Sequence, residues 1–280
     1  MKIDIHSHVI PPETIGKAGK YGPEVVRGEG LTEVRVGEYR TTIWRNPKSP
    51  RFESAPTPEA RIEGMDREGI DVMGCTISPL FYLYWAETEI GIDWSRLNND
   101  ALARYCSAFP ERLFFLATLP LQDIEAGVRE AERAVKQLGA KGINLGTHDI
   151  AGRNLDDEAF WPLYEKVQAY DIPIFVHPYP LGIYDPPGAD KYNLSWAAGY
   201  IHGETLAVAT LMLGGVFDEF PGLKVIVSHG GGSVPFQFGR LEYIAETMRD
   251  VRAKKPLREY LKNFYFDVLV HDAKARQYLV

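Results

Sequence analysis

Two histidines separated by a single residue, His6 and His8, are the first side chains of this sequence that could do chemistry. They lie in a short, largely apolar stretch, residues 2–8 (KIDIHSH), which predicts a β-strand. Residues two apart on a strand point to the same side, so both imidazoles are expected to project from one face. Ionisable rings on a buried strand cost free energy unless something coordinates them. The spacing therefore predicts that His6 and His8 bind one metal ion.

His229 is followed directly by three glycines, residues 230–232. Glycine lets the backbone turn tightly and approach a ligand closely. A histidine at such a turn could take a proton from a metal-bound water, whose pKa falls toward ~7 on zinc. The alternative is a plain tight turn, and we favour the functional interpretation because a histidine precedes it.

Composition limits the classes of protein to which the chain can belong. Its 280 residues suffice for one α/β domain or two smaller ones, and the net charge of −7 argues against binding to nucleic acid or to an anionic membrane. Cys75 and Cys106 do not have the C-x-x-C spacing, so neither a disulfide framework nor a cysteine-based zinc site is predicted. No apolar run approaches the ~18 residues of a membrane span, and the N-terminus lacks the apolar core of a signal peptide. We therefore expect a cytoplasmic protein.

The rest of the chain alternates between predicted strands and helices. Strands are predicted at residues 2–8, 72–77, 113–118, 141–145, 174–176, 224–228 and 264–268. Helices are predicted at residues 57–68, 94–109, 124–138, 157–170, 204–220 and 235–252, with a last one starting near residue 272. The strands are short apolar runs, which is typical of parallel strands covered on both faces.

Seven strand–helix units of this size predict an α/β fold of the TIM (β/α)8 barrel type, in a single domain over residues 1–280. An excursion of loops or small strands interrupts the rhythm at residues 9–56, where residues 31–39 alternate weakly. The eighth strand is missing, because the sequence stops within a helix at residues 277–280. We expect that the given chain is incomplete, although a seven-stranded array closed by another element is also possible. An open doubly wound sheet is the competing architecture.

Six of the seven histidines lie at or just past the end of a predicted strand, whereas His202 precedes a helix. In a TIM barrel the carboxyl ends of the strands meet on the rim where active sites are built. We expect metal binding by three of these histidines: His6, His8 and His177. Three neutral imidazoles suit zinc and leave a coordination position open for water. For His148, His202 and His271 we expect a structural hydrogen-bonding role.

The H-x-H pattern of the first strand combines with V-H-P at residues 176–178 and S-H-G-G-G at residues 228–232. Together they resemble the amidohydrolase superfamily, in particular the branch of carboxylic-acid decarboxylases that contains 2-amino-3-carboxymuconate-6-semialdehyde decarboxylase. The similarity runs through nearly the whole chain and includes ARIEGMD at residues 60–66, PLQD at 120–123 and HGGGS at 229–233.

This resemblance implies roles for individual residues. His6, His8 and His177 would be ligands of one zinc ion per chain, and His229 would be the catalytic acid–base. Superfamily members with two metals carry a lysine at the end of the fourth strand, where this sequence has residues 146–148 (GTH), so one metal is expected. Relatives also supply an aspartate ligand from the eighth strand, and the resemblance assigns that role to neither Asp267 nor Asp272.

The resemblance also suggests how a substrate is held. Arg40 is similar to an arginine that binds a substrate carboxylate, and Arg240 to an arginine contributed across a dimer interface. These similarities imply a small anionic carboxylic-acid substrate and a homodimer, because a guanidinium group binds a carboxylate at two points. Either arginine could instead be a solvated surface charge. Phe81 and Trp196 could line the site of a flat, unsaturated acid, although core or interface packing is the more common role of such residues.

The predicted function is a zinc-dependent, non-oxidative decarboxylase of an unsaturated or aromatic carboxylic acid, which uses a zinc-activated water and His229. No organic cofactor is expected, because there is neither a G-x-G-x-x-G pattern after a strand nor a Walker A sequence. Two alternatives remain open. One is a metal-dependent hydrolase or hydratase that acts on an amide, a lactone or a C=C bond with the same metal site. The other is an inactive binding protein that retains the fold.

Overall fold

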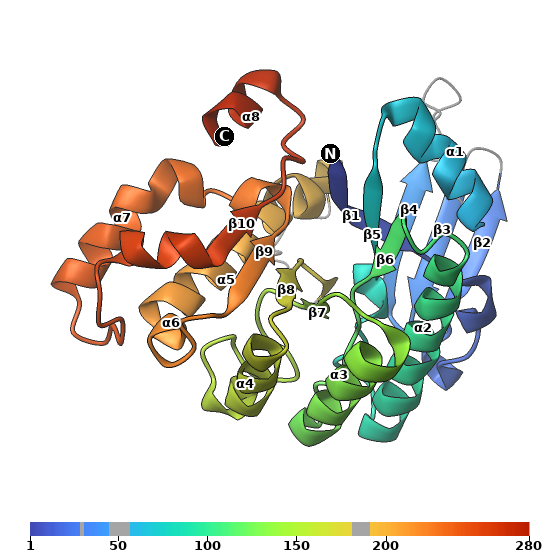
Figure 1. Cartoon of the computed structure of the whole chain (residues 1–280), viewed down its shortest axis with the longest axis horizontal. Helices are drawn as coiled ribbons and strands as arrows, with labels where there is room; N and C mark the ends of the chain where they lie inside the picture. Colours follow the sequence, from blue (N-terminus) through green and yellow to red (C-terminus); the bar gives the residue numbers. More distant parts are fainter. Residues whose placement is uncertain (29–30, 45–56, 181–190, 280) are drawn as a thin grey trace. The chain divides into compact units, whose positions relative to one another are not determined.

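The computed structural model describes residues 1–28, 31–44, 57–180 and 191–279 of the chain (Figure 1). These residues form two compact units, Met1–Lys141 and Gly142–Val280, and each unit is described by itself. A single domain over residues 1–280 stays a prediction.

The first unit contains a parallel sheet of three strands in the order β1-β5-β6. Their bounds are Ile3–Val9 for β1, Val72–Ile77 for β5 and Leu113–Phe115 for β6. Between Asp4 and Ser7 the register shifts, because β1 has one residue more than β5 in this interval. This β-bulge lies in the H-x-H segment, and bulges often re-aim side chains at functional sites.

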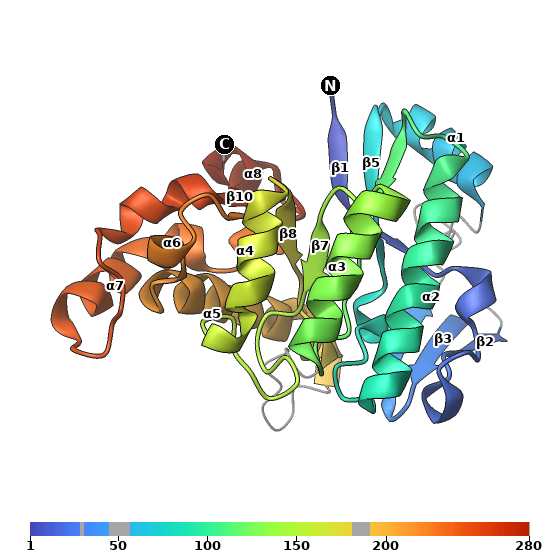
Figure 2. The same ribbon diagram turned by 60° about the horizontal axis from the view of Figure 1, so that its bottom comes forward.

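Three helices accompany this sheet, with the bounds Pro58–Glu68 for α1, Thr88–Ser107 for α2 and Ile124–Leu138 for α3. Helix α1 begins at the predicted signal, since the Thr57 side chain accepts a hydrogen bond from the Ala60 amide at 3.3 Å. Helices α2 and α3 lie side by side (Figure 2). Apolar side chains of the strands form the buried core of this unit: Met73, Cys75, Ile77, Leu113 and Phe115.

Helix α2 begins six residues earlier than the sequence predicts. Gly91 lies in this additional part of the helix, and glycine is a poor helix former. A Cβ atom at Gly91 would come within 2.5 Å of the amide nitrogen of Gln122, which donates to the carbonyl of Leu83 at 2.6 Å. The glycine therefore makes room for a packed side chain, and this tertiary requirement hides the start of the helix from the sequence pattern.

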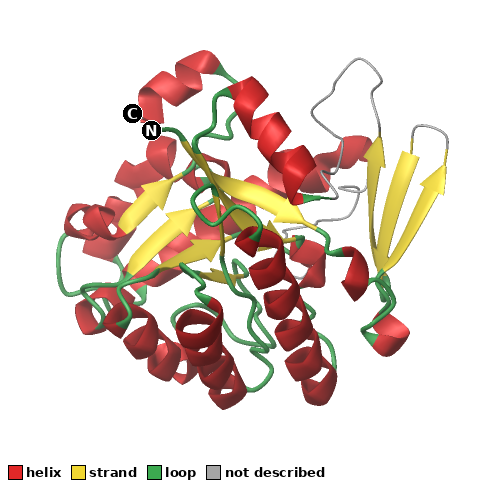
Figure 3. Cartoon of the chain, turned by 45° about the vertical axis from the view of Figure 1, so that its right-hand side comes forward, coloured by secondary structure: helices red, strands yellow, loops and turns green. Residues whose placement is uncertain are grey.

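The predicted excursion contains a separate antiparallel sheet in the order β2-β3-β4, seen at the right of Figure 3. Its strands are Glu24–Gly28 for β2, Leu31–Val36 for β3 and Tyr39–Trp44 for β4. Val34 and Val36 are buried while Arg35 between them is exposed, which is the alternation expected of a sheet covered on one face. Residues 45–56 of the excursion lie outside the described residues.

The second unit is built on a parallel sheet in the order β10-β9-β8-β7. The strands are Ile143–Leu145 for β7, Pro173–Val176 for β8, Lys224–Val227 for β9 and Phe264–Phe266 for β10. The helices are Trp161–Ala169 for α4, Tyr200–Leu213 for α5, Val216–Glu219 for α6, Val234–Thr247 for α7 and Ala273–Leu279 for α8. The sheet buries Ile143, Leu145, Ile174, Val176, Val225 and Val227. All seven predicted strands of the two units are thus present.

One predicted helix, at residues 204–220, is divided in the structure. Helix α5 starts earlier, at Tyr200, after one turn of π-helix at Ser195–Gly199. It ends before Gly215, whose φ of 74° lies in the left-handed region that glycine adopts without strain, and the short helix α6 follows. None of the helices in the described parts of the chain is both long and apolar enough to span a membrane.

Candidate metal-binding and acid–base residues

His6 and His8 lie next to each other in β1, as their spacing predicts. Their ring centroids are 5.1 Å apart and the ring planes meet at 81°. Both side chains are partly buried, and the β-bulge spans His6, whose amide donates to Asp4 Oδ1 at 2.9 Å. The first unit thus presents two imidazoles at a spacing that suits a shared ion.

The Nδ1 atom of His8 fixes the tautomer of its ring. It lies 2.9 Å from Thr76 Oγ1 and 3.1 Å from the carbonyl oxygen of Ile77. A carbonyl oxygen only accepts hydrogen bonds, so Nδ1 carries the proton and the acceptor lone pair of the ring is on Nε2. Metal-binding histidines are typically held by such a hydrogen bond at the other ring nitrogen.

His177 has the same arrangement in the second unit. It follows β8 directly and is 2% exposed, and its Nδ1 donates to the carbonyl oxygen of Pro178 at 2.6 Å. The Nε2 atom of this ring therefore also carries the acceptor lone pair. The His177 ring lies 5.1 Å from the ring of His229, at an interplanar angle of 64°.

His229 is paired with a buried carboxylate that the sequence did not predict. Its Nδ1 donates to Oε1 of Glu204, a fully buried residue of α5, and the Ser228 hydroxyl donates to the same oxygen. Burial lowers the pKa of His229, but the hydrogen bond and the charge of Glu204, together with the charge of Asp267, outweigh it and raise the pKa above its ordinary value. Burial has the opposite effect on the carboxyl group and raises the pKa of Glu204. The two residues form a histidine–carboxylate pair of the kind that orients an acid–base imidazole.

The glycines after His229 allow close packing of the turn, and the last of them approaches helix α5. His229 and residues 230–232 all have positive φ, between 48° and 75°. A Cβ atom at Gly232 would lie 2.4 Å from the carbonyl oxygen of Ile201, so no larger residue fits there without displacing backbone. The amide of Gly230 donates to Asp267 at 2.9 Å, which holds the turn against the end of β10. The turn fixes where the His229 ring lies.

Aromatic side chains cover this histidine pair within the second unit. The Tyr200 ring lies 5.9 Å from His177 and 5.6 Å from His229. Trp196 stacks on Tyr200 at 5.9 Å and 23°, and its side chain is 49% exposed. Trp196, which the sequence suggested for the substrate site, therefore packs on Tyr200, and Tyr200 in turn packs on the two histidines.

The remaining predicted substrate-binding residues lie in different surroundings. Arg40 is exposed on β4, directly opposite Arg35, and Arg240 is exposed on α7. Within the described residues neither Arg40 nor Arg240 forms an ion pair. Phe81 has no exposed surface and packs on Trp94 with ring centroids 5.4 Å apart, which supports a packing role.

The three histidines expected to be structural also follow strands or lie in α5. His148 is partly buried after β7, and burial lowers its pKa. Its Nδ1 has no hydrogen-bond partner among the residues the structure describes, so the expected structural bond is not seen at this atom. His202 and His271 are exposed.

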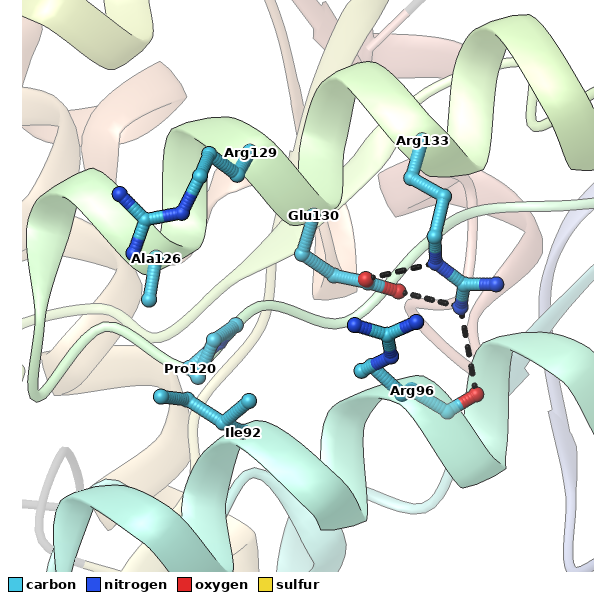
Figure 4. Close-up of a pocket in the computed structure, with 7 residues that line it drawn as sticks. All are labelled: Ile92, Arg96, Pro120, Ala126, Arg129, Glu130 and Arg133. Carbon is cyan, nitrogen blue, oxygen red and sulfur yellow. Dashed lines mark hydrogen bonds and ion pairs between the residues drawn. The ribbon is translucent and has the colours of Figure 1, made fainter.

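A hollow between α2 and α3 contains none of the predicted site residues (Figure 4). It is lined by Ile92, Arg96, Pro120, Ala126, Arg129, Glu130 and Arg133. Its buried Glu130 carboxylate is already bound by Arg133 at 2.8 Å and by the Asn99 amide at 2.7 Å. We therefore interpret this network as support for helix packing.

The chain is similar to known proteins over most of its length. A family model described as amidohydrolase matches residues 3–275. The chain belongs to the amidohydrolase family. It is 32% identical over 288 residues to 2-amino-3-carboxymuconate-6-semialdehyde decarboxylase of Dictyostelium discoideum, which covers 100% of this chain and 77% of that protein. It is also 32% identical over 222 residues to gamma-resorcylate decarboxylase of a Polaromonas species, covering 74% of this chain and 67% of the relative.

Among solved structures, this amidohydrolase is similar to a dihydroxybenzoic acid decarboxylase from Polaromonas with bound manganese and the inhibitor 2-nitroresorcinol. The TM-score is 0.72 at 25% identity, over 95% of this chain and 77% of that one. With the seven parallel strands of the two sheets, this likeness confirms the predicted α/β fold of the TIM-barrel type.

The Glu204–His229 pair predicts a pKa change that does not depend on any activity. In Glu204→Gln the negative charge is lost while burial remains, so we expect the pKa of His229 to fall below its ordinary value. The measurement is an NMR titration of the His229 ring in the metal-free protein. Glu165→Gln, at an exposed glutamate of α4, is the control and should leave the titration unchanged. An unaltered His229 pKa in Glu204→Gln would contradict the pairing.

Proposed function

We propose that this amidohydrolase is a metal-dependent, non-oxidative decarboxylase of an unsaturated or aromatic carboxylic acid. The observation that carries the proposal is the pair of rings at His177 and His229, 5.1 Å apart in the second unit. His177 has the tautomer that a metal ligand requires. His229 has a carboxylate partner, as an acid–base residue commonly does. The relatives named above as decarboxylases support the reaction class.

We propose further that His6, His8 and His177 bind the same divalent metal ion, one per chain. His6 and His8 belong to the first unit and His177 to the second, and each supplies one imidazole. The chemistry of the donors fits, because the Nδ1 protons of His8 and His177 are engaged by carbonyl oxygens and leave Nε2 as the donor atom. Neutral imidazoles favour zinc, although the similar Polaromonas enzyme contains manganese.

The proposed reaction breaks the bond between a carboxylate and the carbon that bears it, releases carbon dioxide and delivers a proton to that carbon. A divalent metal at the three histidines would supply a positive charge that polarises an oxygen of water or substrate. His229 would supply the proton from Nε2, because its Nδ1 is held by Glu204. Its raised pKa favours the protonated form required of an acid.

Arg40 and Arg240 are the proposed partners of substrate carboxylates, since a guanidinium group donates two parallel hydrogen bonds to such a group. Exposed Trp196 is the aromatic residue proposed to contact a flat acid, whereas Phe81 is buried within the first unit and packs on Trp94. A homodimer, in which Arg240 serves the active site of the partner subunit, and a cytoplasmic location complete the proposal.

The proposal predicts metal-dependent release of carbon dioxide. We expect it from at least one member of a panel that contains 2-amino-3-carboxymuconate-6-semialdehyde, 2,6-dihydroxybenzoate and related unsaturated acids, measured together with loss of substrate absorbance. His229→Ala should lower kcat by about 10²- to 10⁴-fold, the usual contribution of a general acid. Turnover without the gas would instead indicate a hydratase or hydrolase. Tight binding of these acids without turnover would indicate a binding protein.

The ligand assignment predicts a separate result for metal content. His6→Ala should lose most of its bound metal in elemental analysis after dialysis, because one of three ligands is removed. His229→Ala should keep the metal content of the wild type. His271→Asn is a matched control, because asparagine tolerates the left-handed backbone of His271 (φ 53°). Full metal occupancy in His6→Ala would remove this residue from the site.

The dimer hypothesis predicts complementation between inactive variants. Arg240→Ala should raise KM strongly, and in a mixed dimer with His229→Ala one of the two sites would be intact. A random mixture should therefore recover roughly a quarter of the wild-type rate, as expected for twofold symmetry. Verified mixed dimers without any recovery would show that Arg240 does not act across the interface.

A further inference from the structure

Helix α1 directs one arginine, Arg61, onto the strand that carries the two histidines. Its Nη1 donates to the hydroxyl of Ser7 at 2.8 Å, and its Nη2 donates to the backbone carbonyl of His8 at 3.1 Å. Ser7 lies between His6 and His8 in the sequence and is 5% exposed. The guanidinium fork therefore holds the H-x-H segment at two consecutive residues.

A second side chain holds the guanidinium group itself. Nε of Arg61 donates to the Tyr105 hydroxyl at 3.4 Å, and that hydroxyl donates to the carbonyl oxygen of Thr57 at 3.1 Å. Thr57 is the N-cap of α1, and Tyr105 belongs to α2. Arg61 is thus connected on one side to two helices and on the other side to β1.

The positively charged group of Arg61 donates its hydrogen bonds to neutral acceptors. In the described residues no carboxylate lies within ion-pair distance of it, and all three of its acceptors are neutral oxygen atoms. The residue is only partly exposed, so part of its hydration is lost on folding. A shorter neutral side chain would avoid this cost but could not reach both Ser7 and His8 with the fixed geometry of a guanidinium fork.

The place where Arg61 binds is also where β1 needs support. The strand contains the bulge between Asp4 and Ser7, where its register against β5 shifts. A bulge disrupts the ladder of hydrogen bonds locally, so fewer of these bonds fix the backbone at this point. The two bonds from Arg61 restrain the Ser7 side chain, which lies between the two histidines in sequence, and the backbone carbonyl of His8.

We propose that Arg61 is a positioning residue, which holds β1 so that His6 and His8 can bind one divalent metal ion. The inference rests on the proposed metal site, and it assigns a role to the segment ARIEGMD at residues 60–66, whose Arg61 contacts no proposed substrate group. Arg61 acts through the backbone of His8 and the side chain of Ser7. Supporting partners of metal ligands commonly change metal affinity by about 10- to 100-fold.

The test measures the affinity of the full-length protein for Zn2+ and for Co2+ by competition with a chelator, together with the visible absorption spectrum of the Co2+ form. Arg61→Ala and Arg61→Lys are compared with the wild type. Arg67→Ala is the matched control, because Arg67 lies on the same helix, is exposed and forms no ion pair among the described residues. We expect about 10- to 100-fold weaker binding and an altered Co2+ spectrum in Arg61→Ala. Millimolar guanidinium ion should restore part of the affinity, and Arg67→Ala should behave as the wild type.

Milder variants cover the case in which Arg61→Ala does not fold. Ser7→Ala removes one acceptor of the fork, and Tyr105→Phe removes the hydroxyl that orients Nε while keeping the ring. Each should weaken metal binding less than Arg61→Ala, and both together more than either alone.

The outcomes distinguish a failure of the inference from a failure of the proposed function. If the wild type binds metal in a His6-dependent manner and folded Arg61 variants retain its affinity and Co2+ spectrum, Arg61 has only a structural role and the inference is overturned. A lower melting temperature alone, with unchanged metal affinity, would overturn it equally. If the wild type binds no metal, the metal site fails and the inference fails with it.

Discussion

Hydrogen bonds at the Nδ1 atoms of three histidines determine what each ring can do. His8 and His177 donate to backbone carbonyl oxygens, which cannot take up a proton and leave a neutral imidazole with its lone pair on Nε2. His229 donates to the Glu204 carboxylate, which stabilises a protonated ring. A histidine can thus be suited either to metal binding or to acid–base chemistry, depending on whether its Nδ1 donates to a carbonyl oxygen or to a carboxylate.

Both units control the backbone near these rings, although by different means. In the first unit the charged side chain of Arg61 holds a bulged strand. In the second, the lack of a side chain at Gly232 lets the turn after β9 approach helix α5 until no Cβ atom would fit. The orientation of the proposed ligands and of the acid–base residue therefore depends on residues that need not touch a substrate, which is why their substitution should affect metal affinity or ring orientation before it affects substrate binding.

Much of the fold could be predicted because its signals are local. The strands are short apolar runs between helices, and Thr57 and Pro58 mark the start of α1 as predicted. Helix α3 has the predicted bounds, residues 124–138. The start of α2 could not be predicted, because Gly91 is required there by the packing of Gln122. The division at Gly215 could not be predicted either, because that glycine is required by a left-handed backbone conformation. The histidines of the candidate site were proposed from their places at strand ends, and their roles stay predictions. Glu204 was missed, because it pairs with a residue 25 positions away and no local pattern encodes that.

Helix α5 carries both the carboxylate bonded to His229 and, one turn earlier, the phenol ring of Tyr200 that packs on the same imidazole. Inserting or deleting one residue between them would rotate one group by about 100° relative to the other. Homologous proteins that keep this arrangement should therefore have no insertion or deletion in this turn, whereas residues on the outer surface of the helix can vary. The spacing of four residues between a tyrosine and a glutamate thus offers a signature by which sequences sharing this device can be recognised.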